Sequence, residues 1–360
     1  MQKKPNGRPG SLFRCKLMHG AIILIFLIIF GSLICLPAAA DPSGTPLRIG
    51  VLANKGTDEC IASWQPTIDY LNTALPNYKF TLVPLTFANI TRATADQDID
   101  FVLSNPAITA DLEAHYGVSN ILTMNNYYDG HYVKEFGGVI ITSSNRQDIR
   151  TSLDLKGKRV AAAGENSFGG WYSVLRELKS QGIDPERDFA SLHFSESHPG
   201  VVISVLNGEA DAGIVRTGTL EQMQDEGKIR ISDFSIFPPP DKYQNHDFPY
   251  LYSTRLYPEW SLAKLPQTDD AAASTVAIAL LNITPDHPSA KAAKMGRWTI
   301  PVNYQSIHDC LKEIGAPPYE NTVVTTPMDI IRDNLWWIVG GLFVISALVF
   351  ITARYRETNR

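Results

Sequence analysis

Three turns in this sequence place small or polar residues at expected helix starts, where an anion could bind. The first turn lies in the segment Arg159 to Leu178. Its small apolar residues Val160 to Ala163 predict a buried strand, and the apolar residues after the turn recur at helical spacing. Between them, Ser167 can cap the helix, and Gly169 and Gly170 let a ligand approach the backbone. A helix start offers unpaired N–H groups and positive potential, so this turn predicts an anion site. An ordinary βα turn shaped by its glycines is the alternative.

The other two turns repeat this pattern of strand, polar turn and helix. Ser104 and Asn105 follow a strand ending at Leu103 and precede a proline, which is typical of a helix start. Arg216 and Thr217 follow a third strand. Open α/β sheets bind ligands at the carboxyl ends of their strands, so we expect the three turns to face one anion.

Arg216 is the one cation in these turns, and its role leaves two readings open. If Arg216 binds the anion, Arg216→Ala should abolish stabilisation by the anion and leave the melting temperature of the unliganded protein nearly unchanged. As a structural residue, it would be solvated or paired with Glu221.

The segments around these turns alternate between strand and helix patterns, which predicts an α/β fold. Two crossings between lobes, near Phe136 to Thr142 and near Tyr250 to Leu256, predict a hinge. The expected strands are Leu47–Ala53, Lys79–Leu85, Ile99–Leu103, Phe136–Thr142, Val160–Ala163, Ser191–Phe194, Ala212–Val215 and Tyr250–Leu256. The expected helices include Cys60–Leu75, Pro199–Asn207, Thr219–Glu226, Ala271–Leu281 and Ser306–Ile314.

Charge narrows the range of ligands. The 360-residue chain has a net charge of −5, but its first 40 residues contain five basic residues and no acid, and its last seven add three arginines and one acid. The segment Asp41 to Asn334 therefore carries a net charge of −12. Such an acidic body argues against nucleic acid as a partner, although a cleft lined by helix starts and an arginine can still bind a small anion.

Both ends of the chain indicate export. Residues 1–40 combine a basic start, an apolar run and the ending Ala38–Ala40, which predicts a signal peptide cleaved before Asp41; an uncleaved anchor is the alternative. Leu335 to Ala353 is apolar and free of charge, which predicts one transmembrane helix, with a buried core helix as the alternative. Arginines follow at once, so residues 354–360 are expected in the cytoplasm and the body in the periplasm, anchored in the bacterial inner membrane.

The body contains two cysteines, Cys60 and Cys310. Export makes a disulfide between them compatible with the sequence, and spacing leaves the question open. No Cys/His cluster or HExxH motif is present, so we expect no metal and no cofactor.

Six segments together resemble the periplasmic phosphonate-binding proteins of ABC importers and, more closely, the ectodomains of tetrathionate-type sensor kinases. They are DFVLSNP (Asp100–Pro106), FGGVI (Phe136–Ile140), DLKGKRVAA (Asp154–Ala162), NSFGGW (Asn166–Trp171), ADAGIVRTGTLE (Ala210–Glu221) and LYPEW (Leu256–Trp260). The resemblance implies a two-lobed type II periplasmic binding protein fold with a hinge. Lobe 1 would comprise residues 47–139 and 251–320, and lobe 2 residues 140–250.

Carried over by position, the resemblance implies ligand contacts at the three turns. Tyr127, Tyr128 and His198 lie in segments that border the cleft in such proteins. The implied ligand-binding residues are Ser104, Asn105, Ser167, Gly169, Gly170, Arg216, Thr217, Tyr127 and His198. The turn SFGG has fewer hydroxyls than the corresponding turn of phosphonate importers, which puts a phosphonate ligand in doubt.

We therefore predict a non-catalytic sensor that captures a small oxyanion, either phosphonate- or phosphate-like or a sulfur oxyanion, and signals by closing its lobes. Its partner would be a separate histidine kinase, because no kinase domain follows the apolar segment in this sequence. The alternative is the binding component of an ABC importer with a separate permease. A hydrolase using Ser167 lacks a GxSxG motif, and a purely structural anchor protein would show no response to ligands.

Overall fold

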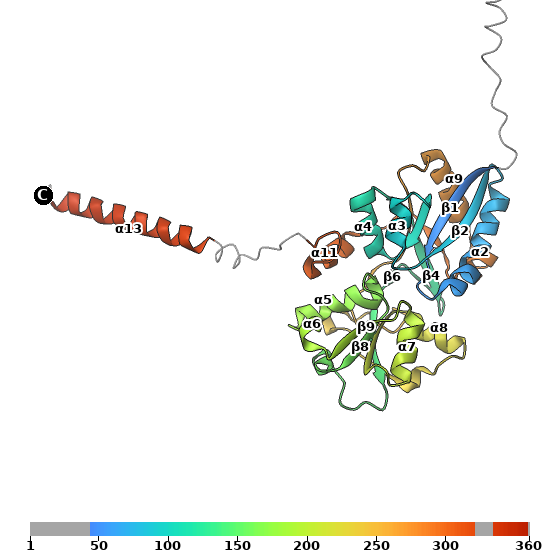
Figure 1. The fold of residues 1–360 in the computed structure, drawn as a ribbon, viewed down its shortest axis with the longest axis horizontal. Helices are drawn as coiled ribbons and strands as arrows, with labels where there is room; N and C mark the ends of the chain where they lie inside the picture. Colours follow the sequence, from blue (N-terminus) through green and yellow to red (C-terminus); the bar gives the residue numbers. More distant parts are fainter. Residues whose placement is uncertain (1–43, 321–333, 359–360) are drawn as a thin grey trace, which may run out of the picture. The chain divides into compact units, whose positions relative to one another are not determined.

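The computed structural model describes residues 44–320 and 334–358. Two β-sheets with their helices form two lobes joined by a hinge (Figure 1), which confirms the predicted two-lobed α/β fold. The predicted signal segment 1–40 lies outside the described residues.

Lobe 1 is built on a seven-stranded sheet with the order β14-β4-β13-β3-β1-β2, in which β5 also pairs with β4. β1 and β3 are parallel, whereas β13 arrives from the second crossing and lies antiparallel to both β3 and β4. The strands are β1 (Thr45–Leu52), β2 (Tyr78–Leu85), β3 (Phe101–Ser104), β4 (Ser119–Tyr128), β5 (His131–Val133), β13 (Ser261–Lys264) and β14 (Arg297–Thr299).

The helices predicted at Cys60–Leu75, Ala271–Leu281 and Ser306–Ile314 are present in lobe 1 and begin and end within three residues of these limits. The apolar face of α2 contributes Ile68 and Leu71 to the core, as its spacing predicts. The helices are α2 (Thr57–Ala74), α3 (Ile90–Ala95), α4 (Pro106–Tyr116), α9 (Asp270–Leu281), α10 (Pro288–Ala292) and α11 (Gln305–Ile314). Of these, α11 contacts α4 of lobe 1 and also α5 of lobe 2.

Lobe 2 is built on a five-stranded sheet with the order β11-β7-β10-β8-β9. Its strands are β7 (Gly138–Ser143), β8 (Arg159–Ala162), β9 (Ser191–Phe194), β10 (Ala212–Arg216) and β11 (Phe234–Ile236). Its helical segments are η1 (Ser152–Leu155), the π-helical turn η2 (Phe168–Tyr172), α5 (Ser173–Ser180), α6 (Pro185–Asp188), α7 (His198–Leu206), α8 (Thr219–Asp225), η3 (Ile231–Asp233) and η4 (Asp241–Tyr243).

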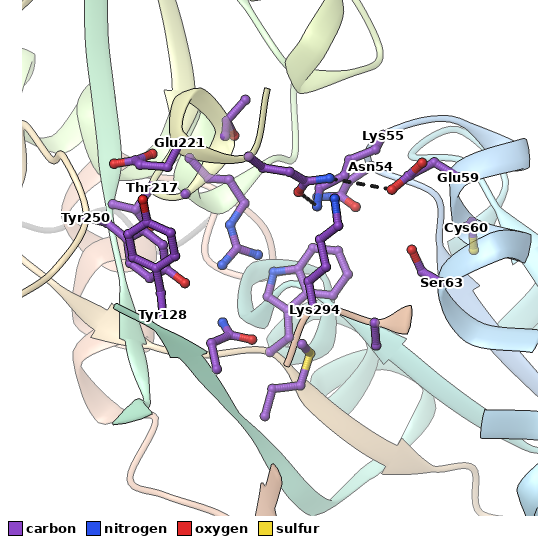
Figure 2. Close-up of a pocket in the computed structure, with 18 of the residues that line it drawn as sticks. Asn54, Lys55, Glu59, Cys60, Ser63, Tyr128, Thr217, Glu221, Tyr250 and Lys294 are labelled. Atoms are coloured by element: carbon purple, nitrogen blue, oxygen red, sulfur yellow. Dashed lines mark hydrogen bonds between the residues drawn. The ribbon is translucent and has the colours of Figure 1, made fainter. Parts of the chain in front are cut away.

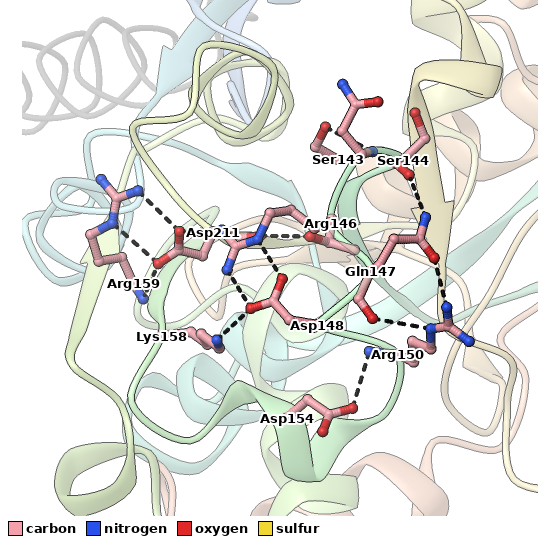
Figure 3. A network of polar contacts seen from close by, with 12 residues as sticks. Ser143, Ser144, Arg146, Gln147, Asp148, Arg150, Asp154, Lys158, Arg159 and Asp211 are labelled. Atoms are coloured by element: carbon pink, nitrogen blue, oxygen red, sulfur yellow. Dashed lines mark hydrogen bonds and ion pairs between the residues drawn. The ribbon is translucent and has the colours of Figure 1, made fainter.

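A network of ion pairs joins the start of β8 to the loop before β10 (Figure 3). Asp211 accepts hydrogen bonds from Arg146 Nη1 at 2.6 Å and from Arg159 Nη2 at 3.0 Å. Asp148 extends the network by accepting from Arg146 Nε at 2.7 Å and from Lys158 Nζ at 2.7 Å. Because each carboxylate serves two cations, the network fixes the loops at this end of lobe 2.

The hinge contains a short sheet of β6 (Glu135–Phe136) and β12 (Tyr257–Pro258). The first crossing is at Gly137, where a Cβ atom would lie 2.8 Å from Thr254 Oγ1 and 3.1 Å from the carbonyl oxygen of Arg255. The close approach of the two crossing segments therefore requires glycine here. Since β7 begins at Gly138, the second sheet starts two residues before the predicted limit of lobe 2.

The predicted strand Tyr250–Leu256 is wrong. Here the segment meets β7 through single hydrogen bonds and forms no strand: Ser253 N donates to the Gly138 carbonyl at 2.7 Å. The Ser253 hydroxyl also accepts from Ile140 N at 2.9 Å and donates to the Phe237 carbonyl at 2.6 Å. Side chains and the neighbouring strand thus satisfy this segment's polar groups, and only Tyr257–Pro258 is a strand.

Two further predictions concern the cysteines and the C-terminal segment. Cys60 and Cys310 are both free and buried, so the disulfide that the sequence left open is absent. Burial raises the pKa of each thiol to about 12. The C-terminal segment forms α13 (Leu335–Thr358). None of the helices in the described part of the chain has the length and apolar character needed to cross a membrane.

Candidate functional site

A cavity of about 320 Å³ lies between the lobes, at the carboxyl ends of β1 and β10 (Figure 2). Lobe 1 supplies the β1–α2 loop and residues of α2, β4 and the α10–β14 turn, and lobe 2 supplies the end of β10, the turn after it and residues of α8. The polar and aromatic residues that line the cavity are Asn54, Lys55, Glu59, Ser63, Trp64, Asn126, Tyr127, Tyr128, Arg216, Thr217, Thr219, Glu221, Gln222, Asp225, Tyr250, Trp260 and Lys294.

Arg216 lines this cavity, but its charge is already paired. Its Nη2 donates to Glu259 Oε1 at 2.5 Å, and the guanidinium carbon lies 4.7 Å from the ring centroid of Phe136 and 5.6 Å from that of Trp260. The Arg216 side chain is 14% exposed and that of Glu259 is 1% exposed. Arg216 is therefore neither solvated nor paired with Glu221, whose Oε1 accepts from Leu251 N at 2.6 Å.

Glu259 is held by two more donors besides Arg216. Asn126 Nδ2 donates to its Oε1 at 2.7 Å, and the backbone N–H of Trp260 donates to its Oε2 at 3.0 Å. A carboxylate with three donors in a buried position is strongly fixed. This pair sets the position of Arg216 beside the cavity.

Two lysines join the lobes across the cavity. Lys55 follows β1 and donates its Nζ hydrogen bond to Gln222 Oε1 of α8. Lys294 follows α10 and forms an ion pair with Glu226 at the end of α8. Burial and the nearby charge of Arg216 lower the pKa of Lys55 to about 8.

Aromatic rings form another wall. Tyr128 stacks on Tyr250 with 4.6 Å between centroids and an angle of 19° between the ring planes. Tyr127 lines the cavity, and its ring centroid lies 5.1 Å from that of Tyr132. The contact of Tyr128 with Tyr250 joins the end of β4 to the loop that leads into the second crossing.

Three buried polar atoms of residues that line the cavity have no hydrogen-bond partner within the part of the chain that the structure describes. They are Trp260 Nε1, Thr219 Oγ1 and Glu221 Oε2. An unpaired buried polar group costs about 1–3 kcal/mol, so each is a position where a bound molecule could supply the missing partner.

The turn at Ser104 and Asn105 does not line this cavity. Asn105 caps α4, as predicted, and its Oδ1 accepts from Ala107 N at 3.0 Å. Its Nδ2 donates to the carbonyl of Asn166 in lobe 2 at 3.3 Å, and the Ser104 hydroxyl bonds to that of Thr109 at 2.9 Å. Both side chains are buried, and their polar groups already have hydrogen-bond partners. In this arrangement they link the two lobes and stabilise the start of α4.

The turn at Ser167 is also buried beside the cavity rather than in its lining. Ser167 caps η2, with its hydroxyl accepting from Gly170 N at 3.2 Å. A Cβ on Gly169 would lie 2.8 Å from the Cβ of Arg216, and one on Gly170 would lie 2.6 Å from that of Ala163. The glycines thus admit neighbouring side chains, which is the alternative that the sequence left open.

His198 is likewise outside the cavity lining. It is 2% exposed, its Nδ1 accepts from Arg216 N at 3.3 Å, and its backbone N–H donates to the Asn54 carbonyl at 3.3 Å. Burial, together with the charges of Arg216 and Lys55, holds its pKa well below the usual value, so His198 is a neutral acceptor here. Of the three predicted turns, only that of Arg216 and Thr217 lines the cavity.

Several residues of the cavity escaped the sequence analysis, among them Lys55, Lys294, Trp260 and Tyr250. For Lys55, the surrounding sequence does contain the pattern used to select the other turns. Lys55 follows the strand β1 and precedes Gly56, whose φ of 101° requires glycine, and then α2. This is a fourth strand, polar turn and helix, so the pattern that selected the other turns also selects this one.

Comparisons with known proteins agree with this architecture. Residues 49–303 match the family described as "ABC transporter, phosphonate, periplasmic substrate-binding protein". The tetrathionate sensor histidine kinase TtrS of Salmonella typhimurium is 31% identical over 313 residues, which cover 86% of this chain. The chain spans about half the length of that relative, 50%.

Two solved structures show the same two-lobed periplasmic binding protein fold. PhnD1 from Prochlorococcus marinus, in complex with methylphosphonate, has a TM-score of 0.62 and 17% identity, covering 76% of this chain and 99% of its own. A binding protein component of an ABC phosphonate transporter from Pseudomonas aeruginosa has a TM-score of 0.64 and 12% identity, covering 88% and 100%. At these identities the likeness concerns the fold.

Proposed function

We propose that this chain, which belongs to the family of periplasmic phosphonate-binding proteins of ABC transporters, is a sensor that captures a small oxyanion between its lobes. Lobe closure over the anion would be the signal. The family consists of solute-binding proteins, so binding and release, without chemistry on the ligand, account for the function.

The observation that carries this proposal is the composition of the cavity between the lobes. Cationic side chains reach it from both lobes, and Trp260 Nε1 is a buried donor with no partner among the described residues. A small anion with several acceptor oxygens balances the cationic side chains and accepts a hydrogen bond from Trp260 Nε1. Each charge-assisted hydrogen bond contributes about 1.5–3 kcal/mol, so four or five of them, less the cost of closure, reach micromolar affinity.

Phosphonate- or phosphate-like anions and sulfur oxyanions both fit these requirements. PhnD1 was solved with methylphosphonate, and the sensor kinase relative is named for tetrathionate. The higher sequence identity is with the sensor kinase, which favours a sulfur oxyanion and a sensing role.

The partner proposed for sensing is a histidine kinase, because the 31% identical relative is a sensor histidine kinase. The alternative is a separate ABC permease, since the family is named for ABC transporters. Purification of the tagged chain from membranes, followed by identification of the protein that accompanies it, separates these roles.

We propose a membrane anchor on the sequence alone. Leu335 to Ala353 contains no charged residue, and Arg354 and Arg356 follow it, which places the C-terminus in the cytoplasm if the segment spans. Retention of the chain in the membrane pellet after alkaline carbonate washing is the expected result. Release into the supernatant would remove the anchor from the proposal and leave binding unaffected.

Binding is tested by calorimetry on the purified full chain with methylphosphonate, phosphate, thiosulfate and tetrathionate. We expect at least one anion to bind with micromolar or tighter affinity and to raise the melting temperature. If none of the four binds, the proposed function is wrong.

A further inference from the structure

The three cations that line the cavity differ in how their charges are balanced. Arg216 is paired with Glu259, and Lys294 with Glu226. Lys55 forms no ion pair within the described part of the chain, and its Nζ donates to the neutral amide of Gln222. Lys55 is therefore the cation of this cavity whose charge lacks a direct counter-charge.

The position of Lys55 makes this imbalance costly. The side chain is mostly buried where the β1–α2 loop of lobe 1 meets α8 of lobe 2. Removing an ammonium group from water costs several kcal/mol unless an anion compensates for it. Bringing the lobes together around Lys55 is thus unfavourable until a negative charge enters the cavity.

We propose that Lys55, rather than Arg216, provides the main charge contact to the bound anion and ties its capture to the joining of the lobes. This inference rests on the proposed function, since it names the residue by which the same cavity selects an anion. Arg216 then positions the cavity wall through Glu259, and Gln222 carries the contact of Lys55 across to lobe 2.

The charged groups that surround Lys55 determine how binding should depend on pH. Arg216 and Lys294 lower its pKa, Glu59 and Glu226 raise it, and burial is the largest effect, giving about 8. His198 on α7 is buried close by, and its own lowered pKa keeps it neutral at pH 7 and above. Lys55 is therefore the group that loses its charge just above neutral pH, and the affinity for an anion should fall there.

The first test uses tetrathionate, whose charge is constant between pH 7 and 9. We expect wild-type affinity to fall about tenfold between these pH values, since a group with a pKa of about 8 is mostly neutral at pH 9. Lys55→Gln should weaken binding at pH 7 by about 10- to 100-fold and abolish the pH dependence. Lys55→Arg should retain binding and also lose the pH dependence, because its guanidinium stays charged.

Lys291→Gln is the matched control, because Lys291 is 65% exposed, pairs with Asp286 and lies outside the cavity lining. It should bind as wild type does. Equal affinity of wild type and Lys55→Gln at pH 7, or an unchanged pH profile in Lys55→Arg, would overturn the role of Lys55 and leave the proposed function standing.

If wild type binds another anion of the panel instead, the variants are compared with that anion at pH 7. Loss in Lys55→Gln together with retention in Lys55→Arg supports the inference, and equal binding by all three proteins overturns it. Absence of binding to wild type by all four anions overturns both the inference and the proposed function.

Discussion

Replacing Glu259 by glutamine removes the charge that balances Arg216 while keeping nearly the same shape. The amide has one accepting oxygen, so it can keep the bond from Asn126 or the bond from the Trp260 backbone, which reach different oxygens of Glu259, but not both. The neutral group cannot balance the guanidinium, which is left mostly buried between the rings of Phe136 and Trp260. The variant therefore removes the counter-charge of Arg216 and one accepting oxygen, while the size of the side chain at position 259 is kept.

The magnitude follows from the burial of the pair. Breaking a buried ion pair by removing one partner costs about 3–5 kcal/mol. Glu259 is 1% exposed and Arg216 is 14% exposed, so solvent reduces the cost of the unpaired charge only slightly. We expect a loss of stability at the lower end of this range, about 3 kcal/mol. At about 2 °C per kcal/mol for a chain of this size, the melting temperature should fall by about 6 °C.

Thermal unfolding of the wild type, Glu259→Gln, Arg216→Gln and the double variant checks this reasoning. The double variant leaves no unbalanced charge, so its melting temperature should exceed the value expected from adding the two single effects. An oxyanion should stabilise Glu259→Gln more than wild type, because it can replace the missing charge. A Glu259→Gln melting temperature within 1 °C of wild type, or strictly additive single effects, would refute the argument.

Three further predictions concern other parts of the molecule. Arg176→Gln should lower the free energy of unfolding by about 1 kcal/mol. The substitution removes the ion pair between Arg176 and the half-exposed Glu313 and the 3.1 Å hydrogen bond from Arg176 to the Tyr257 hydroxyl. An unchanged denaturation midpoint contradicts this. The two arginines bound to Asp211 hold its pKa well below the usual value, so its stabilising effect should be present above about pH 4 and lost as the pH falls below that value. The stability difference between wild type and Asp211→Asn should accordingly shrink in acid, and a constant difference down to pH 2 would contradict the assignment. Both body cysteines should react with iodoacetamide in the unfolded, unreduced chain, whereas a lack of labelling would indicate a disulfide.

Local signals in the sequence were enough to predict most of the fold. Asn105 followed by Pro106 marks the start of α4, and Ser167 marks the start of η2, because capping depends on neighbouring residues alone. The strands β4 and β13 were missed. β4 carries buried Asn125 and Asn126 near its end, and β13 has only four residues, so neither shows a clear apolar pattern.

The candidate site was less predictable because its contacts join distant segments. Nothing local links Arg216 to Glu259, 43 positions away, and the sequence therefore led us to expect a free arginine whose removal would not affect stability. The buried ion pair predicts the opposite for Arg216→Ala. Glu221, the partner considered from the sequence, is near in the chain, but it points to the Leu251 backbone instead.

The helix α11 bonds to both lobes, so its position depends on how the lobes are arranged. It packs on α4 of lobe 1, while its residues Glu313 and Ile314 accept hydrogen bonds from Arg176 and Lys179 of lobe 2. Movement of lobe 2 away from lobe 1 must therefore either break these bonds or pull α11 away from α4.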